Sequence, residues 1–310
     1  MGNVYVIGGS NLDIQGAPFS GLIMADSNPG VVRCSFGGVG RNIAENLALM
    51  KDHVVLVSAM GNDAFGLDMY RYCESVGMDM KYCIQANENT ANYLAIMDAK
   101  NDMALAICDN RILHCLTPDY MDTVFGSMKE DDIIVLDTNL EEDIIRYILK
   151  HANHRIYCDP ISTSKAQKIL FDMDKLYMLK PNKLEAEMIS GILLDDPNDY
   201  RKAVQWFRDS GLQQIIISLG KDGVIGADRN RMVHRNHPYM PMKNATGAGD
   251  CFVAGFVHGS MENMDLVDSI KFAIASAVVT VQSEFTVSEL MSKEKVCEVM
   301  DTIDFTIREL

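Results

Sequence analysis

One short segment near the C-terminal end of the chain combines glycines with a carboxylate. Residues 244–250 read Asn-Ala-Thr-Gly-Ala-Gly-Asp, and the apolar run 251–257 predicts a buried helix that starts at this loop. The first amides of a helix lack intrahelical partners and lie at the positive end of its dipole, so they form an anion site. Asp250 beside that site suits a carboxylate that takes a proton from a hydroxyl attacking phosphorus, while the amides hold the developing charge.

A simpler interpretation of this segment stays open. A glycine-rich turn followed by a helix with Asp in its first turn is common in proteins that bind no phosphate. The loop alone does not distinguish a phosphate site from a simple helix cap, so motifs elsewhere in the chain are needed to choose between them.

A second group of small and polar residues lies near the N-terminus. The run 4–9 predicts a buried strand that ends in two glycines, and Asn11 and Asp13 follow where this strand would emerge. Residues 37–47 place three glycines at the start of an apparent helix. Such a cluster is also typical of a dinucleotide loop, but that loop normally leaves the first strand directly, and this one comes about thirty residues later.

Five motifs, taken in order, resemble those of the ribokinase-like (PfkB) family of carbohydrate and nucleoside kinases. The matching stretches are residues 37–44 (GGVGRNIA), 61–66 (GNDAFG), 180–187 (KPNKLEAE), 218–223 (SLGKDG) and 244–250 (NATGAGD). The resemblance spans nearly the whole chain. It implies an α/β fold, with a mostly parallel sheet covered by helices and a small β-sheet lid, and ATP-dependent phosphorylation of a hydroxyl group.

The resemblance assigns catalytic roles to the C-terminal motif. Asp250 is expected to be the general base toward a 5′-hydroxyl. The amides expected to stabilise the transferring phosphoryl group are those of Gly247, Ala248 and Gly249.

Binding roles fall on the other motifs. The residues expected to contact the ribose, through side chains or close backbone approach, are Asn11, Asp13, Gly37, Gly38 and Asn42. The residues expected to contact ATP are Asn182, Glu185, Ser218, Gly220 and Gly223. Glu185 would hold Mg²⁺ through water, because Mg²⁺ tends to retain several waters.

Two positions differ from the family pattern. Lys51 stands where the first signature usually has a small residue, which we expect to change only a helix end. The second signature usually opens Asp-Thr, whereas this chain has Asn244-Ala245. In many relatives that Asp helps to bind a monovalent cation, so a cation site at Asn244 and Thr246, and with it K⁺ as a cofactor, stays open.

Within the family, the chain resembles the pseudouridine kinase branch. The residues behind this are 8–16, 26–30 and 38–47, with the Asp-Ser-Asn-Pro-Gly stretch followed by Val-Gly-Arg-Asn. Other substrates remain open: ribose, fructose, adenosine, inosine or cytidine. A regulator that kept the fold and lost catalysis is a further alternative, against which the intact Asp250 counts. A dinucleotide-dependent oxidoreductase fits less well, since the glycine loop lies in the wrong place.

Composition excludes several classes of protein. The chain has 310 residues, 48% of them hydrophobic, and a formal net charge of −15. This acidity argues against a nucleic-acid partner, which requires a basic face. No signal peptide or membrane-spanning run is seen, so we expect a cytoplasmic protein.

The eight cysteines show no zinc spacing, and Cys108, Cys158 and Cys251 lie in apolar runs, so we expect reduced, mostly buried thiols.

The rest of the chain alternates between apolar strands and helical stretches, which favours one α/β domain over residues 1–310. Segments 14–35 and 81–114 are predicted to form the lid over the sugar pocket, and the lid a homodimer surface. Asp137 and Asp159 end two predicted strands, where polar side chains are as often caps as ligands. The sequence assigns no residue to the recognition of the nucleobase of a nucleoside substrate.

Overall fold

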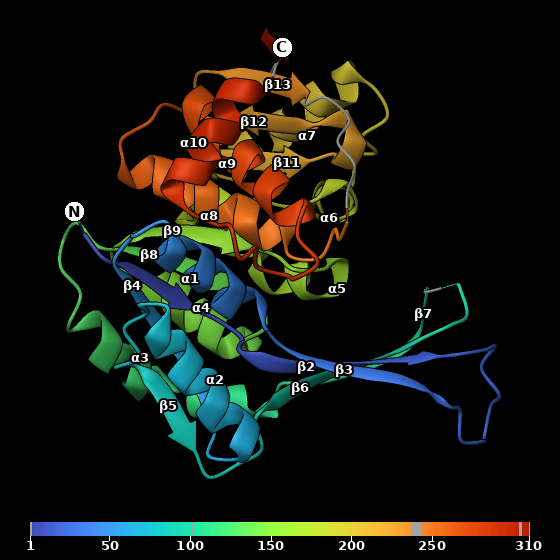
Figure 1. Cartoon of the computed structure of the whole chain (residues 1–310). Coiled ribbons are helices and arrows are strands. Elements are labelled where there is room, and N and C mark those ends of the chain that lie inside the picture. The colour runs from blue at the N-terminus through green and yellow to red at the C-terminus, as the bar shows by residue number, and fades with distance from the viewer. Residues whose placement is uncertain (1, 101, 237–242, 304–305, 310) are drawn as a thin grey trace.

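The structure of the chain is a computed structural model that describes residues 2–100, 102–236, 243–303 and 306–309. The described residues form one large sheet between two layers of helices and a second, smaller sheet that projects from this body (Figure 1). The predicted fold class is confirmed. Among the described residues, no helix is both long and apolar enough to cross a membrane.

The main sheet is parallel over most of its width. Its strands, in spatial order, are β14 (Thr306–Glu309), β13 (Met232–Asn236), β12 (Val224–Ala227), β11 (Gln214–Ser218), β10 (Met178–Leu179), β9 (Arg155–Asp159), β8 (Ile133–Asp137), β1 (Val4–Ile7), β4 (Val54–Gly61) and β5 (Cys83–Ala86). The strands from β11 to β5 run parallel, and β12, β13 and β14 add antiparallel pairings at one edge. Every residue of β1, β4 and β8 is buried, as expected for strands covered on both faces.

Two apolar clusters fill the layers on either side of this sheet. The first cluster lies between the sheet and α1 (Val39–Leu49), α2 (Ala64–Ser75), α8 (Ala248–Met261), α9 (Leu266–Val281) and α10 (Lys293–Thr302). The second lies between the sheet and α3 (Pro118–Phe125), α4 (Glu142–His151), α5 (Thr163–Ala166), α6 (Lys183–Ser190) and α7 (Pro197–Asp209). Alternate residues of β1 belong to opposite clusters, because successive strand side chains point to opposite faces.

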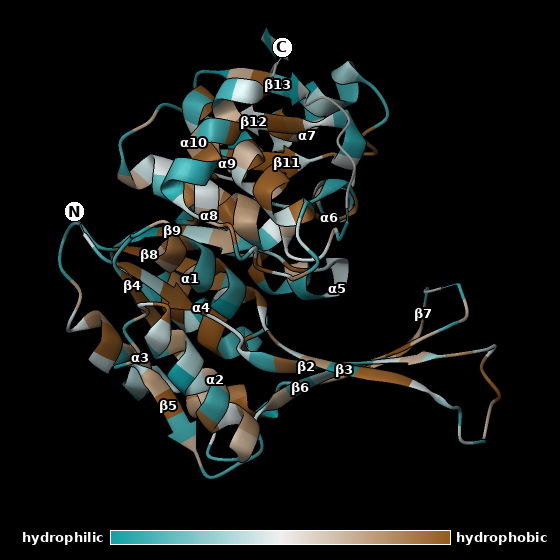
Figure 2. Ribbon diagram, in the orientation of Figure 1, coloured by the Kyte–Doolittle hydropathy of each residue, from teal (hydrophilic) through white to brown (hydrophobic). Residues whose placement is uncertain are grey.

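The second sheet has four strands in the order β3 (Gly30–Gly37), β2 (Asn11–Pro18), β6 (Ala91–Met97) and β7 (Met103–Asp109). The pair β2–β6 is parallel and the other two pairs are antiparallel. Strand β5, although it falls within the segment 81–114, pairs with β4 in the main sheet. Figure 2 shows apolar residues along this projecting sheet, which no helix layer covers.

The uncovered second sheet explains one wrong expectation. Cys158 and Cys251 are buried, but Cys108 is exposed because β7 is an edge strand outside the helix layers. All eight cysteines are free thiols, as expected. Strand β10 is short, with two residues, and a 3-10 turn, Met173–Lys175, comes shortly before it.

Candidate active site

The carboxyl ends of the parallel strands gather the polar residues. Strand β8 ends at Asp137, β9 ends at Asp159, and Lys180 follows β10. These three side chains are buried, at 0%, 5% and 5% exposure. In parallel α/β sheets this edge is where ligands bind, and the N-termini of the following helices point the same way.

The glycine loop caps the N-terminus of α8. Gly247 is the N-cap residue, with a φ of 82°, and a Cβ there would lie 2.0 Å from the carbonyl oxygen of Thr286. A side chain would be excluded on both grounds, so the tight turn requires glycine. Ala248 and Gly249 are the first helical residues, where amides have no partner within the helix. The loop and the start of α8 thus have the backbone form that the predicted anion site requires, and the site itself stays a prediction.

Asp250 occupies the first turn of α8, directly beside these amides. Its Oδ2 accepts a hydrogen bond of 2.7 Å from Nδ2 of Asn42, on α1. Burial and the charge of Asp159 raise the pKa of Asp250 to about 7, against the lowering influence of Asn42 and Lys180. A carboxylate with this pKa is a better proton acceptor near neutral pH than an ordinary Asp.

Lys180 supplies a positive charge next to the same loop. Its Nζ donates to Oδ2 of Asp159 at 3.1 Å, and a Cβ built on Gly249 would lie 3.1 Å from that Nζ. Burial alone would lower the pKa of Lys180, but the charges of Asp159, Glu185 and Asp250 raise it above the usual value. The ammonium group therefore stays protonated at the anion site.

Asp137 holds the two N-terminal glycine turns together. Its carboxylate accepts hydrogen bonds from the amides of Gly9 (2.8 Å), Gly40 (2.7 Å) and Asn139 (2.8 Å). Burial raises its pKa, and the three amide donors counteract that shift. Asp137 is thus fully engaged by the backbone, which makes it a structural support for the loops that carry the predicted sugar contacts.

The predicted sugar contacts lie where the second sheet joins the body. Asn11 and Asp13 begin β2, and Nδ2 of Asn11 donates to Oδ1 of Asp13 at 2.5 Å. A Cβ on Gly37 would lie 2.2 Å from Oδ2 of Asp13, and Gly38 caps α1 with a φ of 98°. The fold brings these residues to the end of α1 that carries Asn42, and through Asn42 to Asp250.

Asn182 and Glu185 form a capping box at the start of α6. The amide of Glu185 donates to Oδ1 of Asn182 (2.9 Å), and the amide and Nδ2 of Asn182 donate to the Glu185 carboxylate (2.8 and 2.7 Å). Glu185 is 3% exposed, and burial raises its pKa. The pair therefore has a structural role, whatever it also binds.

The predicted nucleotide contacts lie beside this capping box. Ser218 ends β11 and forms an isolated parallel β-bridge with Asn182. Its amide donates to the carbonyl of Pro181 at 3.0 Å. Gly220 and Gly223 follow in a tight turn, with φ values of 60° and 91°. The contacts expected for ATP thus occupy one stretch of the same sheet edge as Lys180.

Comparison with known proteins settles the family. Residues 1–292 match the pfkB family of carbohydrate kinases. The chain belongs to this family. It is also 35% identical to pseudouridine kinase of Escherichia coli (strain K12) over 286 residues, which is 91% of each chain. A PfkB-type protein is a kinase for a sugar or a nucleoside, so the motif order predicted the activity class correctly.

Solved PfkB-type folds superpose on the whole chain. Ribokinase of Thermotoga maritima gives a TM-score of 0.84 at 22% identity, covering 97% of this chain and 100% of that one. Ribokinase of Arabidopsis thaliana, complexed with ribose and ATP, gives 0.82 at 19% identity, with 96% and 98% covered. At these identities the likeness is one of fold.

The two departures from the PfkB pattern have local explanations. Lys51 follows the end of α1 with a φ of 72°, a left-handed conformation that glycine adopts more readily. Oδ1 of Asn244 accepts from the amide of Thr246 at 2.9 Å, and its Nδ2 donates to the carbonyl of Glu284 at 3.2 Å. Asn244 brings no negative charge, and both polar atoms of its side chain are engaged by these contacts, so a K⁺ site here stays an untested prediction.

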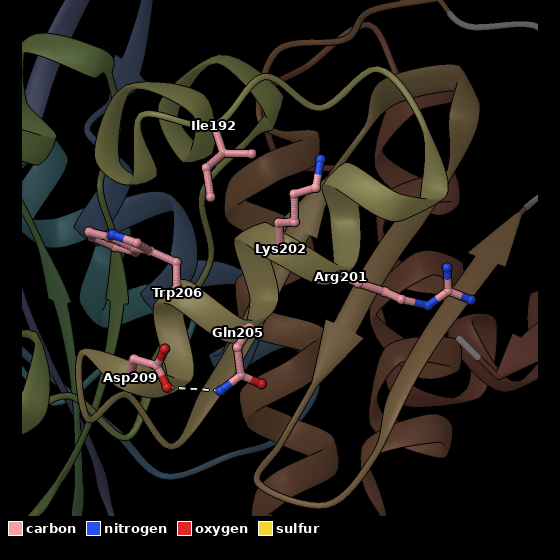
Figure 3. Close-up of a pocket in the computed structure, with 6 residues that line it drawn as sticks. All are labelled: Ile192, Arg201, Lys202, Gln205, Trp206 and Asp209. Atoms are coloured by element: carbon pink, nitrogen blue, oxygen red, sulfur yellow. Dashed lines mark hydrogen bonds between the residues drawn. The ribbon is translucent and has the colours of Figure 1, made fainter.

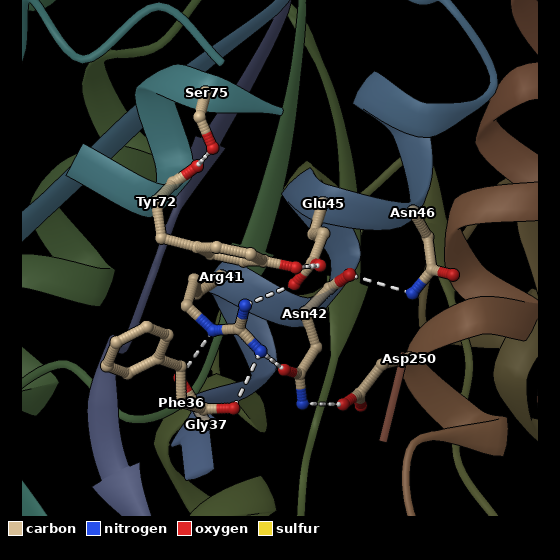
Figure 4. A network of polar contacts seen from close by, with 9 residues as sticks. All are labelled: Phe36, Gly37, Arg41, Asn42, Glu45, Asn46, Tyr72, Ser75 and Asp250. Atoms are coloured by element: carbon tan, nitrogen blue, oxygen red, sulfur yellow. Dashed lines mark hydrogen bonds and ion pairs between the residues drawn. The ribbon is translucent and has the colours of Figure 1, made fainter. Parts of the chain in front are cut away.

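Four residues of this PfkB site were not singled out from the sequence. Lys180 could have been found, since a lysine directly after a strand lies at the ligand edge. Arg41, Glu45 and Tyr72 form a polar network with Asn42 (Figure 4), in which Tyr72 alone is exposed. Their contacts join α1 to α2, and no local pattern signals a pairing over 27 residues.

Two other features lie outside the PfkB motifs. A surface pocket of about 570 Å³ runs along α7 (Figure 3), lined by Ile192, Arg201, Lys202, Gln205, Trp206 and Asp209. None of these is a predicted site residue. Glu88, His114 and Cys115 also approach one another within 4.8 Å, but two of the three are exposed and Nε2 of His114 already lies 2.9 Å from the Glu88 carboxylate. We assign neither feature a role.

Proposed function

We propose that this protein transfers the γ-phosphoryl group of ATP to the 5′-hydroxyl of a nucleoside, with pseudouridine as the first candidate. The observation that carries the proposal is Asp250, a carboxylate held by Asn42 in the first turn of α8, next to the helix amides and the Lys180 ammonium. The 35% identity to a pseudouridine kinase supports the choice of substrate.

Asp250 would take the proton of the attacking hydroxyl. Its raised pKa of about 7 matches the task, because a general base works best when its pKa is close to the ambient pH. The amides of Gly247, Ala248 and Gly249 would bind the transferring phosphoryl group at the positive end of α8. Lys180 would add a fixed positive charge on the same side.

Mg²⁺ fits the groups that the fold gathers here. Asp159, Glu185 and Asp250 bring three carboxylates around the single ammonium of Lys180, and hard cations prefer oxygen ligands. Glu185 and Asn182 would hold the ion through water, since their direct hydrogen bonds serve the capping box. When bound, Mg²⁺ would neutralise part of the negative charge on the ATP phosphates.

Asp13 and Asn11 would bind the ribose hydroxyls. Burial raises the pKa of Asp13, although its bond to Asn11 opposes the shift, and its carboxyl oxygens are acceptors that ribose hydroxyls can donate to. Gly37 and Gly38 would let the sugar approach the backbone. Because these residues lie at the root of the second sheet, that sheet would act as a lid that keeps water from ATP.

The lid would also form a homodimer surface. Met103, Leu105 and Ile107 share one face of β7, and each is more than half exposed. A monomer rarely leaves such a row of apolar side chains uncovered, so a second copy of the chain would cover it.

The test is ADP release by the purified protein with Mg-ATP and, in separate reactions, pseudouridine, uridine, adenosine, ribose or fructose. Strong turnover with pseudouridine and little with uridine is the expected result. Turnover only with another acceptor would keep the kinase and refute the substrate. ATP binding without turnover on any acceptor would overturn the catalytic function and favour a regulatory one.

A further inference from the structure

A continuous set of polar contacts, buried at its centre, leads from α2 through α1 to Asp250 (Figure 4). The hydroxyl of Tyr72 donates to Glu45, the Glu45 carboxylate pairs with the Arg41 guanidinium, and Arg41 donates to Oδ1 of Asn42. Nδ2 of Asn42 then donates to Asp250 at 2.7 Å. Arg41, Asn42 and Glu45 are 2%, 4% and 4% exposed, so water has little access to the contacts among these three side chains, whereas Tyr72 at the far end is 38% exposed.

We propose that Arg41 is a positioning residue for Asp250: its guanidinium fixes the amide of Asn42 in the one orientation that presents an N–H donor to the carboxylate. Glu45 and Tyr72 hold the guanidinium in place. This inference deepens the proposed function, on which its catalytic meaning rests.

The side-chain amide of Asn42 has one acceptor atom and one donor atom, and its two neighbours differ in what they offer. A guanidinium only donates hydrogen bonds, so the Asn42 atom that faces Arg41 must be its carbonyl oxygen. The amide nitrogen must then face Asp250. A flipped amide would bring two donors together at Arg41 and two oxygens together at Asp250. Arg41 therefore keeps Asp250 as a hydrogen-bond acceptor, which is the form that takes up a proton.

Arg41 itself is held at several points that a lysine could not match. Its Nε donates to the carbonyl of Gly37 and an Nη to the carbonyl of Phe36, both at 2.9 Å, at the end of β3. Two further contacts go to Glu45 and Asn42. The planar guanidinium serves four partners at once, whereas an ammonium has three donors on a flexible stem.

The Tyr72 end of the network is fixed in polarity as well. Burial and the Glu45 carboxylate raise the pKa of the Tyr72 hydroxyl, so it remains a donor throughout the accessible pH range. Glu45 thus accepts from Tyr72 on one oxygen and from Arg41 on the other. Removing the Tyr72 hydroxyl would loosen the network without removing a charge.

The other groups that face Asp250 would be unchanged by substitutions in this network. They are Asp159 and Asp137 at the ends of β9 and β8, which raise its pKa, and Lys180 after β10, which lowers it. A change in the titration of Asp250 on substitution of Arg41 would therefore report the loss of the Asn42 donor.

The experiment compares the wild type with Arg41→Lys and Tyr72→Phe. Arg208→Lys is the matched control, because Arg208 also donates to two carbonyls, of Asp228 and Arg231, but lies on α7 away from Asp250. The readouts are kcat and KM, the acidic limb of the kcat/KM profile, and the ¹³C titration of the Asp250 carboxyl, assigned by its loss in Asp250→Asn.

We expect Arg41→Lys to lower kcat about tenfold, with little change in KM for ATP, because a misaligned base slows only the chemical step. Loss of a donor to the ionised carboxylate raises its pKa, so the acidic limb and the ¹³C titration should move to higher pH by about half a unit or more. Tyr72→Phe should move both in the same direction by less, and Arg208→Lys should move neither.

A folded Arg41→Lys protein with the wild-type titration and acidic limb would overturn the inference. If that variant does not fold, Tyr72→Phe decides: an upward shift supports the inference and an unchanged titration overturns it. A wild type inactive on every acceptor would refute the proposed function alone, since the ¹³C titration of Asp250 needs no turnover.

Discussion

At the carboxyl edge of the main sheet, charged side chains are buried and each has protein partners, whereas on the second sheet large apolar side chains are exposed. Asp137, Asp159, Lys180 and Glu185 are at most 5% exposed, and Leu105 and Ile107 on β7 are 56% and 57% exposed. Both regions reverse the usual distribution of polar and apolar groups. Each of these four charged groups already has a hydrogen-bond partner within the chain, whereas no helix layer of the described residues covers the second sheet.

This comparison predicts that substitutions at the sheet edge change chemistry, while substitutions on the second sheet change association and substrate capture. The largest effect is expected from Asp250→Asn. Turnover should fall by a factor of roughly 10³ because no base remains to take the hydroxyl proton, while nucleotide affinity stays within about threefold of wild type. Steady-state kinetics would measure the turnover, and a nucleotide titration would measure the affinity.

Asp52→Asn is the control for this variant. The Asp52 carboxylate accepts a hydrogen bond of 2.8 Å from Nδ1 of buried His258, which lies on α8 as Asp250 does. Asp52 itself contacts none of the proposed site residues. Its loss should lower the free energy of unfolding by about 1–3 kcal/mol and leave turnover near wild type. Near-normal turnover in Asp250→Asn would remove the proposed base.

The next effect in size tests the backbone of the anion site. Gly247→Ala should lower kcat about a hundredfold, because a Cβ there would lie 2.0 Å from the Thr286 carbonyl and force the loop to move. Gly191→Ala is the matched control: Gly191 also has a positive φ, of 70°, at the end of α6, but a Cβ there meets nothing within 4 Å.

Both glycine variants should lose about 1 kcal/mol of stability from the unfavourable φ alone. Only Gly247→Ala should lose turnover. Equal kinetics in the two variants would show that the amides of the loop take no part in catalysis.

The sequence predicts the elements of the fold better than it predicts the contacts at the sheet edge or the exposure of the second sheet. The strands, the helix at the glycine loop and the grouping of motifs followed from apolar runs and motif order, because each signal is local. The partners of Asp250 were not predictable, since Asn42 lies 208 residues away and its orientation depends on Arg41. Exposure of Cys108 was mispredicted for a related reason: an alternating pattern marks a strand, not whether a helix layer covers it.

A smaller effect is expected on the second sheet. Leu105→Asp should weaken self-association, measured by sedimentation velocity, and raise KM for the nucleoside several-fold while kcat stays within about threefold. Leu193→Asp is the control, since Leu193 is also exposed, at 67%, but lies on the body. A wild type that sediments as a monomer at every concentration would contradict the proposed dimer.

The smallest effect concerns the thiols. Cys108→Ser should change the free energy of unfolding by less than about 0.5 kcal/mol because the side chain is exposed, whereas Cys158→Ser buries a hydroxyl in β9 and should cost about 1–3 kcal/mol. Burial also raises the pKa of Cys158, so iodoacetamide should label Cys108 and spare Cys158. Equal labelling would show that the second sheet is as well covered as the body.

The proposed kinase activity is tested most directly by following the phosphoryl group from ATP to its acceptor. Phosphorus NMR of a reaction of the wild-type protein with Mg-ATP and pseudouridine would follow ADP and the new phosphate ester together. We predict one equivalent of nucleoside 5′-monophosphate for each ADP formed, and no ester with Asp250→Asn. ADP accompanied only by inorganic phosphate, or an ester that still forms at the wild-type rate without Asp250, would contradict the proposed function.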